Sequence, residues 1–98
     1  MKKIRYGIIG CGSMGREHIE NIRAMPGTAV TALADTHAKS REQAVALLES
    51  APAVFDNYAD LLSSGLCDAV VIATPNFTHV EILRAALATD LHILAEKP

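Results

Sequence analysis

The chain has 98 residues, half of them hydrophobic, and a formal net charge of −2. This length allows one domain with a core, and the mixed charges exclude both a basic stripe for nucleic acid and a polybasic membrane patch. The apolar residues that follow the lysines near the start are too few for a signal peptide. No segment approaches the roughly 18 apolar residues of a membrane span. We therefore expect a cytoplasmic protein.

The two cysteines have neither metal-ligand spacing nor the pattern of a disulfide framework, so we expect Cys11 and Cys67 to be reduced. Cys11 lies in a glycine-rich turn before a helix, where a thiol can acidify. A redox-sensitive role stays open beside the simpler interpretation of a small side chain in a tight loop. His18 has no second ligand at a suitable spacing, and no metal site is predicted.

Residues 4–9 form an apolar run that predicts the first strand. A glycine turn follows, and then a helix with Ile19, Ile22 and Met25 at helical spacing, which Pro26-Gly27 ends. The second strand is predicted over residues 29–34 and is followed by Asp35.

The second helix is predicted from about Lys39 to Ser50, because Pro52 prevents it from continuing. Its expected core face holds Ala44, Val45, Leu47 and Leu48. Lys39, Arg41, Glu42 and Gln43 are expected to face water.

A short strand at residues 53–55 and a short helix at 58–63 come next, with Gly65 as the helix stop. Residues 68–73 are the most apolar run, which favours a central strand covered on both faces. After Thr74-Pro75-Asn76, a helix is expected with Val80, Leu83 and Leu87 as its core stripe. The last strand is predicted over 91–95.

Five strands that alternate with helices predict an α/β fold, a Rossmann-type doubly wound parallel sheet with strands in the order 3-2-1-4-5. Residues 1–98 would form one such domain, lacking the sixth strand of the complete fold. The carboxyl ends of four strands carry Gly10, Asp35, Thr74 and Glu96. Because ligands bind at that edge of an open α/β sheet, these residues should converge on one site.

The spacing of Gly10, Gly12 and Gly15 is typical of a dinucleotide-binding turn between a strand and a helix. The first glycine makes the turn, the second lets backbone approach a pyrophosphate, and the third lets helix and strand pack closely. Asp35 lies 20 residues beyond Gly15, where a carboxylate can bind a ribose 2′-hydroxyl. The alternative is that Asp35 only caps the next helix.

Three motifs together resemble the Gfo/Idh/MocA oxidoreductases: the glycine turn with His18, Thr74-Pro75-Asn76-x-x-His79, and Glu96-Lys97-Pro98. The resemblance covers essentially the whole chain and implies an N-terminal domain that binds NAD, with NADP possible. It implies pyrophosphate contacts from the turn residues Gly10, Cys11, Gly12, Ser13, Met14 and Gly15, and an adenosine ribose contact from Asp35. It further implies that Thr74, Pro75, Asn76 and His79 lie near the nicotinamide half, with Glu96 and the catalytic Lys97 at the nicotinamide ribose, and often a cis bond before the proline at position 98.

Such enzymes move hydride between the nicotinamide and a secondary alcohol of a sugar, cyclitol or related polyol, and they use a further domain for substrate. The 98 residues hold no such domain, so we expect this chain alone to bind cofactor without turnover. We also expect self-association through the uncovered strand 91–95. A non-catalytic module that senses NAD(H) is the alternative. Asp35 favours NAD over NADP, a preference that Lys39 and Arg41 could soften.

Overall fold

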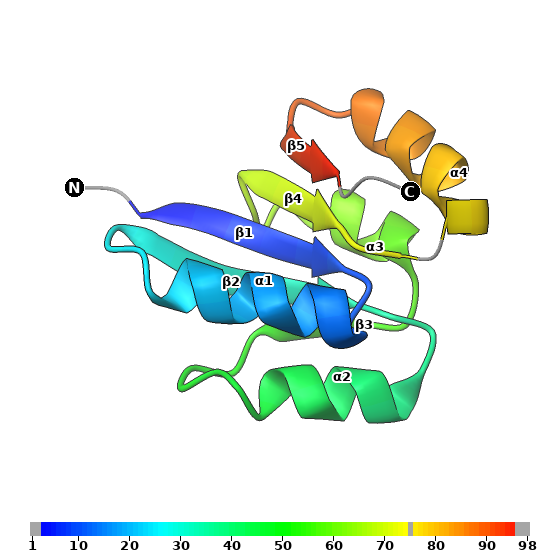
Figure 1. The fold of residues 1–98 in the computed structure, drawn as a ribbon. Coiled ribbons are helices and arrows are strands. Elements are labelled where there is room, and N and C mark those ends of the chain that lie inside the picture. Colours follow the sequence, from blue (N-terminus) through cyan, green and yellow to red (C-terminus); the bar gives the residue numbers. More distant parts are fainter. Residues whose placement is uncertain (1–2, 75, 96–98) are drawn as a thin grey trace.

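Five parallel strands form one sheet with helices on both faces (Figure 1). The computed structural model describes residues 3–74 and 76–95. The strand order is β3-β2-β1-β4-β5, as the sequence predicts. The strands are β1 (Ile4–Ile9), β2 (Thr28–Ala34), β3 (Ala53–Phe55), β4 (Ala69–Ile72) and β5 (His92–Ala95); the helices are α1 (Ser13–Arg23), α2 (Ala38–Val45), α3 (Tyr58–Leu62) and α4 (Asn76–Leu87).

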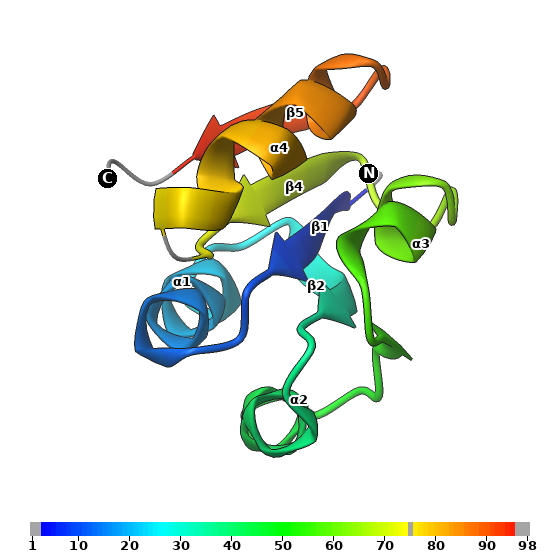
Figure 2. The same ribbon diagram turned by 90° about the vertical axis from the view of Figure 1, so that its right-hand side faces the viewer.

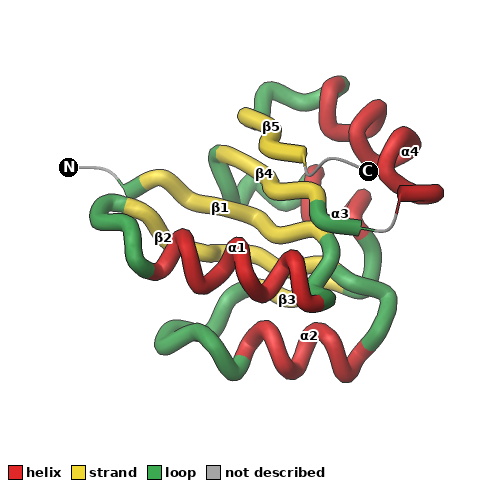
Figure 3. The backbone as a smooth tube through the Cα atoms, in the orientation of Figure 1, coloured by secondary structure: helices red, strands yellow, loops and turns green. Residues whose placement is uncertain are grey.

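Each helix connects two strands and lies against the sheet, and Figure 3 shows this alternation of helix and strand along the chain. The buried apolar side chains of α1 and α2 belong to one core cluster and those of α3 and α4 to the other, so the two pairs of helices cover opposite faces; Figure 2 shows α1 and α3 on opposite sides of the sheet. Two clusters of buried side chains form the core, one on each face of the sheet. All four residues of β4 are buried, with Val70 and Ile72 in one cluster and Val71 in the other. This burial is expected of a parallel strand with helices on both sides.

The sheet brings the carboxyl ends of its strands to one edge. Central β1 pairs with β2 on one side and β4 on the other. Hydrogen bonds continue just past the strand ends: the Gly10 N–H donates to the Ala34 carbonyl at 2.8 Å, and the Ala73 N–H donates to Ile9 at 2.8 Å. The segments that follow β1, β2 and β4 therefore leave the sheet side by side.

Two helices end earlier than their patterns predict. α1 ends at Arg23, and Met25 beyond it is exposed. α2 ends at Val45, five residues before Ser50, because the chain tightens there into i to i+3 hydrogen bonds that end on Leu47 and Leu48. Those two leucines still pack against the core, so the predicted apolar face is right although the helix is shorter. Among the helices of the described residues, none has the length and apolarity to cross a membrane.

The predicted core stripe of α4 is wrong in two of its three residues. Val80 and Leu87 are 64% and 68% exposed, whereas Ile82 and Ala86 are buried and Leu83 packs partly against the core. Ile82 and Ala86 are four residues apart, on the side of the helix that meets the sheet. The prediction passed over Ile82 and the small Ala86 and so placed the stripe on the neighbouring side of the helix.

Candidate cofactor-binding site

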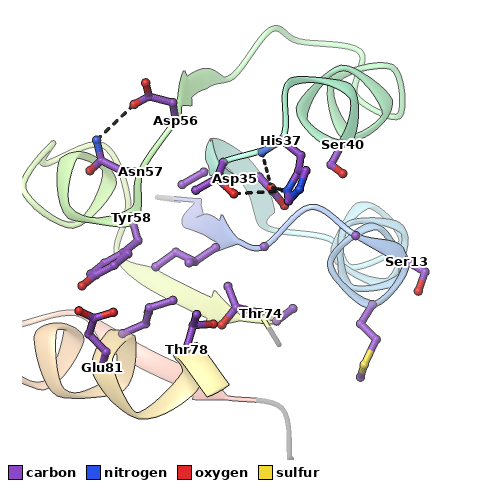
Figure 4. A pocket seen from close by; sticks show the side chains of 18 residues that line it. Ser13, Asp35, His37, Ser40, Asp56, Asn57, Tyr58, Thr74, Thr78 and Glu81 are labelled. Carbon is purple, nitrogen blue, oxygen red and sulfur yellow. Dashed lines mark hydrogen bonds and ion pairs between the residues drawn. The ribbon is translucent and has the colours of Figure 1, made fainter. Parts of the chain in front are cut away.

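A pocket of about 680 Å³ opens at the carboxyl edge of the sheet (Figure 4). Its wall includes Gly10 and residues 12–14 after β1, residues 35–37 and Ser40 after β2, and residues 56–58 after β3. Thr74 after β4 and three residues of α4 complete the described wall. This is where the order of strands reverses between β1 and β4, the position at which open α/β sheets bind ligands.

The three glycines of the turn are needed for three different reasons. Gly10 has φ +99, and a Cβ there would lie 2.7 Å from the backbone of Ala73. A Cβ on Gly15 would overlap the Gly10 carbonyl group. A Cβ on Gly12 would meet nothing within 4 Å, so this glycine leaves open space beside the pocket. These are the tight turn, the close packing and the free approach that the spacing predicts.

The first turn of α1 presents backbone donors to this space. Gly12 is the N-cap, and no side chain caps the helix. The free N–H groups of a first helical turn and its positive dipole end favour an anion. The Arg16 guanidinium donates instead to the Cys11 carbonyl and to Gln43, each at 2.9 Å, and it does not line the pocket. A phosphate bound at this turn would be held by backbone.

Asp35 joins the glycine turn to the end of β2. Its carboxylate accepts the Cys11 N–H at 2.7 Å and the His37 N–H at 2.8 Å, and its side chain is only 14% exposed. The N-cap of α2 is His37, so the interpretation of Asp35 as an N-cap is wrong in its strict form. Asp35 also lines the pocket. Its contact with a ribose stays a prediction.

Cys11 is buried beneath the turn, with its Sγ 3.7 Å from the Ala34 carbonyl oxygen. Burial raises the pKa of the Cys11 thiol to about 12, and the nearby Asp35 carboxylate acts in the same direction. Burial also raises the pKa of the Cys67 thiol, and neither cysteine forms a disulfide. A buried thiol with a raised pKa is unreactive, which favours the simpler interpretation of Cys11 as a small side chain in a tight turn.

Among the described residues, Oγ1 of the partly buried Thr74 is the one buried side-chain oxygen or nitrogen that lacks a hydrogen-bond partner. Its Oγ1 is buried at the carboxyl end of β4, and the residue lines the pocket. Because a buried hydroxyl without a partner is costly, this atom is suited to a hydrogen bond with a bound molecule. The structure is therefore consistent with the predicted cofactor role of Thr74.

The remaining predicted site residues fall into two groups. His79 is buried in α4 and is absent from the described pocket wall. Asn76 begins α4, but its side chain lies outside what the structure describes. Also outside the described residues are Pro75, Glu96, Lys97 and the bond before Pro98. Their predicted roles stay predictions.

Sequence reasoning missed several pocket residues, which come from the segment after β3 and from α4. Asp56, Asn57 and Tyr58 follow β3, and Thr78 and Glu81 lie in α4. Residues 56–58 come directly after a predicted strand, so the rule that selected Asp35 and Thr74 could have selected them too. The Glu81 side chain could be found only from the packing of α4 against the sheet.

The parallel sheet, the glycine turn after its central strand and the carboxylate after β2 together define a dinucleotide-binding domain of the Rossmann type. The chain belongs to the Gfo/Idh/MocA oxidoreductases: residues 4–98 match the family model described as an oxidoreductase family with an NAD-binding Rossmann fold. This confirms the resemblance seen in the sequence.

Known relatives share the full length of this chain but are much longer. An inositol 2-dehydrogenase from Arthrobacter sp. (strain FB24) is 40% identical over 96 residues, which cover 97% of this chain and 28% of that protein. The structure of myo-inositol dehydrogenase from Lactobacillus casei in complex with NAD(H) and myo-inositol has a TM-score of 0.92 and 32% identity, covering 98% of this chain and 29% of that one. The structure of KijD10, a 3-ketoreductase from Actinomadura kijaniata in complex with TDP-benzene and NADP, has a TM-score of 0.86 and 31% identity. The match covers 99% of this chain and 31% of that chain.

Proposed function

We propose that this chain is the cofactor domain of a dehydrogenase that moves hydride between NAD and a secondary alcohol of an inositol or a related polyol or sugar. The observation that carries the proposal is the glycine turn beside the Asp35 carboxylate: a Cβ on Gly12 would meet nothing within 4 Å, Asp35 accepts a hydrogen bond from the neighbouring Cys11 N–H, and both Gly12 and Asp35 line the pocket. Support for the substrate class comes from relatives named as inositol dehydrogenases, of which this chain spans about 28%. Substrate contacts would then come largely from the rest of such a protein.

Each described residue would act by binding and orienting the cofactor. The backbone N–H groups of the first turn of α1 would hold the pyrophosphate. The Asp35 carboxylate would accept a hydrogen bond from a ribose hydroxyl, and Thr74 Oγ1 would gain the hydrogen-bond partner that it lacks. When bound, NAD supplies the hydride chemistry, and the protein supplies position and electrostatics. Lys97 would assist proton transfer at the substrate, with Glu96 and His79 near the nicotinamide half.

The charges of the pocket favour NAD over NADP. Three carboxylates, those of Asp35, Asp56 and Glu81, line it, and no lysine or arginine is among the described lining residues. A 2′-phosphate would meet the Asp35 carboxylate at the ribose. The Arg41 guanidinium donates to the Asp35 carbonyl at 2.6 Å, outside the pocket wall, and Lys39 is exposed. These two cations leave the preference in place.

Calorimetric titration of the purified protein with NADH and NADPH tests this proposal. We expect NADH to bind and NADPH to bind at least about tenfold more weakly, the factor that corresponds to roughly 1.4 kcal/mol. Asp35→Ala should raise the affinity for NADPH relative to NADH, while Lys39→Ala should leave the NADH affinity unchanged. If a folded protein binds neither dinucleotide, the proposal fails.

Turnover separates the enzyme from a sensor. The longer protein that carries this domain should reduce NAD in the presence of an inositol or related polyol, and residues 1–98 alone should not. A full-length protein that binds NADH but oxidises no polyol or sugar alcohol would indicate the alternative, a module that senses NAD(H). Polyol-dependent reduction of NAD by residues 1–98 would contradict the expectation that this part binds the cofactor without turnover.

A further inference from the structure

The pocket extends past the glycine turn to a second group of side chains on the other face of the sheet. Tyr58 begins α3, and Glu81 and Ile82 lie in α4, yet all three line the same pocket as Asp35. Figure 4 shows the labelled Tyr58 and Glu81 on neighbouring helices, across the pocket from Ser13 and His37. A dinucleotide that binds at the glycine turn and Asp35 thus has space toward α3 and α4.

The two directions away from Asp35 differ in chemistry. Toward α2 the wall is polar, with Thr36, His37 and Ser40. Toward α3 and α4 the wall also has polar residues, Asp56, Asn57 and Thr78, but this side alone adds an aromatic ring, from Tyr58, which packs partly against the core, and the buried aliphatic side chain of Ile82. A flat base gains most from stacking and apolar contact. The side of Tyr58 and Ile82 is therefore the better surface for the base of the cofactor.

Glu81 places a carboxylate beside this apolar surface. Its side chain is exposed, and within the described part of the chain it makes no hydrogen bond or ion pair. An ionised carboxylate only accepts hydrogen bonds, so a partner must bring a donor. Adenine presents such a donor, the amine at C6, whereas hypoxanthine presents a carbonyl oxygen at the same atom.

We infer that Glu81 determines which base the pocket accepts, by accepting a hydrogen bond from the C6 amine of adenine and repelling the C6 carbonyl of an oxopurine. The inference rests on the proposed function, because it assumes a dinucleotide at the glycine turn. Tyr58 and Ile82 contact the faces of the base, and Glu81 binds the edge that carries the C6 group. Discrimination arises because the oxopurine would leave the carboxylate facing an acceptor.

The test compares NADH with reduced nicotinamide hypoxanthine dinucleotide, which differs from NADH at C6 of the base. Calorimetric titration of the purified protein should show NADH bound at least about tenfold more tightly, as expected for a hydrogen bond to a charged group. In Glu81→Gln the ratio should fall below about threefold, because an amide can donate to the carbonyl or accept from the amine. Glu42→Gln, an exposed glutamate of α2 outside this pocket wall, should keep the original ratio.

The ratio of the two affinities is the decisive quantity, since damage to the fold would weaken both ligands together. Equal binding of the two dinucleotides by the unaltered protein would overturn the role of Glu81 and leave the cofactor proposal intact. An unchanged ratio in Glu81→Gln would have the same meaning. Binding of neither dinucleotide by the folded protein would overturn both proposals.

Discussion

Gly12 and Gly15 share a residue type but contribute differently to the site. Gly15 is buried where α1 meets the turn, and its hydrogen stands where a methyl group would overlap the Gly10 carbonyl. Gly12 has an extended backbone, with φ −71 and ψ −166, that any residue adopts, and it has open space in front of it. Substitution of Gly15 should therefore affect mainly the stability of the fold, and substitution of Gly12 mainly the binding of the cofactor.

Gly12→Ala should lower the free energy of unfolding by only about 0.5–1 kcal/mol, because alanine is a poorer N-cap than glycine, and still weaken NADH binding at least about tenfold. The new methyl group would occupy space that a pyrophosphate needs. Gly15→Ala should cost roughly 1–3 kcal/mol of stability through overpacking. Denaturant unfolding and calorimetric titration of both variants measure the two effects. Unimpaired NADH binding by Gly12→Ala would place the phosphates elsewhere.

Cys11 makes stability depend on pH in the alkaline range. Its thiol has a pKa of about 12 in the folded protein against an ordinary value of 9.0. The unfolded chain therefore loses this proton from about pH 9, while the folded chain keeps it to about pH 12. The stability that the protonated Cys11 thiol contributes to the folded protein is fully present below the ordinary thiol pKa and is lost as the pH rises to the raised pKa.

Between pH 7 and pH 10 the protein should lose about 1 kcal/mol more stability than Cys11→Ser, because serine is similar in size and does not titrate in this range. Denaturant unfolding at the two pH values measures the difference. Cys67 remains in both proteins, so its own raised pKa cancels in the comparison. Equal losses in the two proteins would show that the Cys11 thiol ionises as readily folded as unfolded.

At the residue scale, part of the site was predictable because one turn determines it. The positions of Gly10, Gly12 and Gly15 in one short segment imply their roles through local backbone geometry, and the structure has that geometry. The contacts of Asp35 with two N–H groups depend on how β1 and β2 align, which spacing along the chain does not reveal. Glu81 depends on the packing of α4 against the sheet.

At the scale of elements, the order of helices and strands follows from the alternation of apolar runs with helical patterns. The least predictable element was α4, where Ala86 is buried and Leu87 is exposed. Hydrophobicity alone favours the leucine. What decides burial is which side of the helix meets β4 and β5, where a small side chain allows close approach.

Ile82→Ala should cost roughly 2–5 kcal/mol of stability, because it removes a buried side chain and leaves a cavity. Leu87→Ala, five residues further along α4, should cost less than about 0.5 kcal/mol, since Leu87 is 68% exposed. Thermal or denaturant unfolding of both variants gives the two values. Similar losses would mean that the original stripe, with Leu87 in the core, is the right one.

At the scale of the whole molecule, β5 lies at one end of the sheet, next to β4 alone in the described residues. Ile93 and Ala95 pack toward the core, whereas Leu94 on the opposite face is 53% exposed. A strand at the edge of a sheet presents backbone groups and side chains with which another chain can pair.

Residues 1–98 should therefore self-associate through β5 as their concentration rises. Leu94→Lys should weaken the association, because a charged side chain on an edge strand opposes pairing. Sedimentation over a range of concentrations measures the mass of both proteins. Lys39→Ala, on α2 far from β5 in the sheet order, serves as the control. A monomer mass independent of concentration would contradict the prediction.

The central position of β1 has a consequence for how the chain folds during synthesis. Of the five described strands, β1 is synthesised first. It can pair with β2 once residue 34 has been added, but its other edge stays unpaired until β4, at residues 69–72, has been made. Pairing of strands so distant in sequence is slow and leaves apolar surface exposed meanwhile. The nascent chain should therefore be a client for chaperones until β4 has emerged.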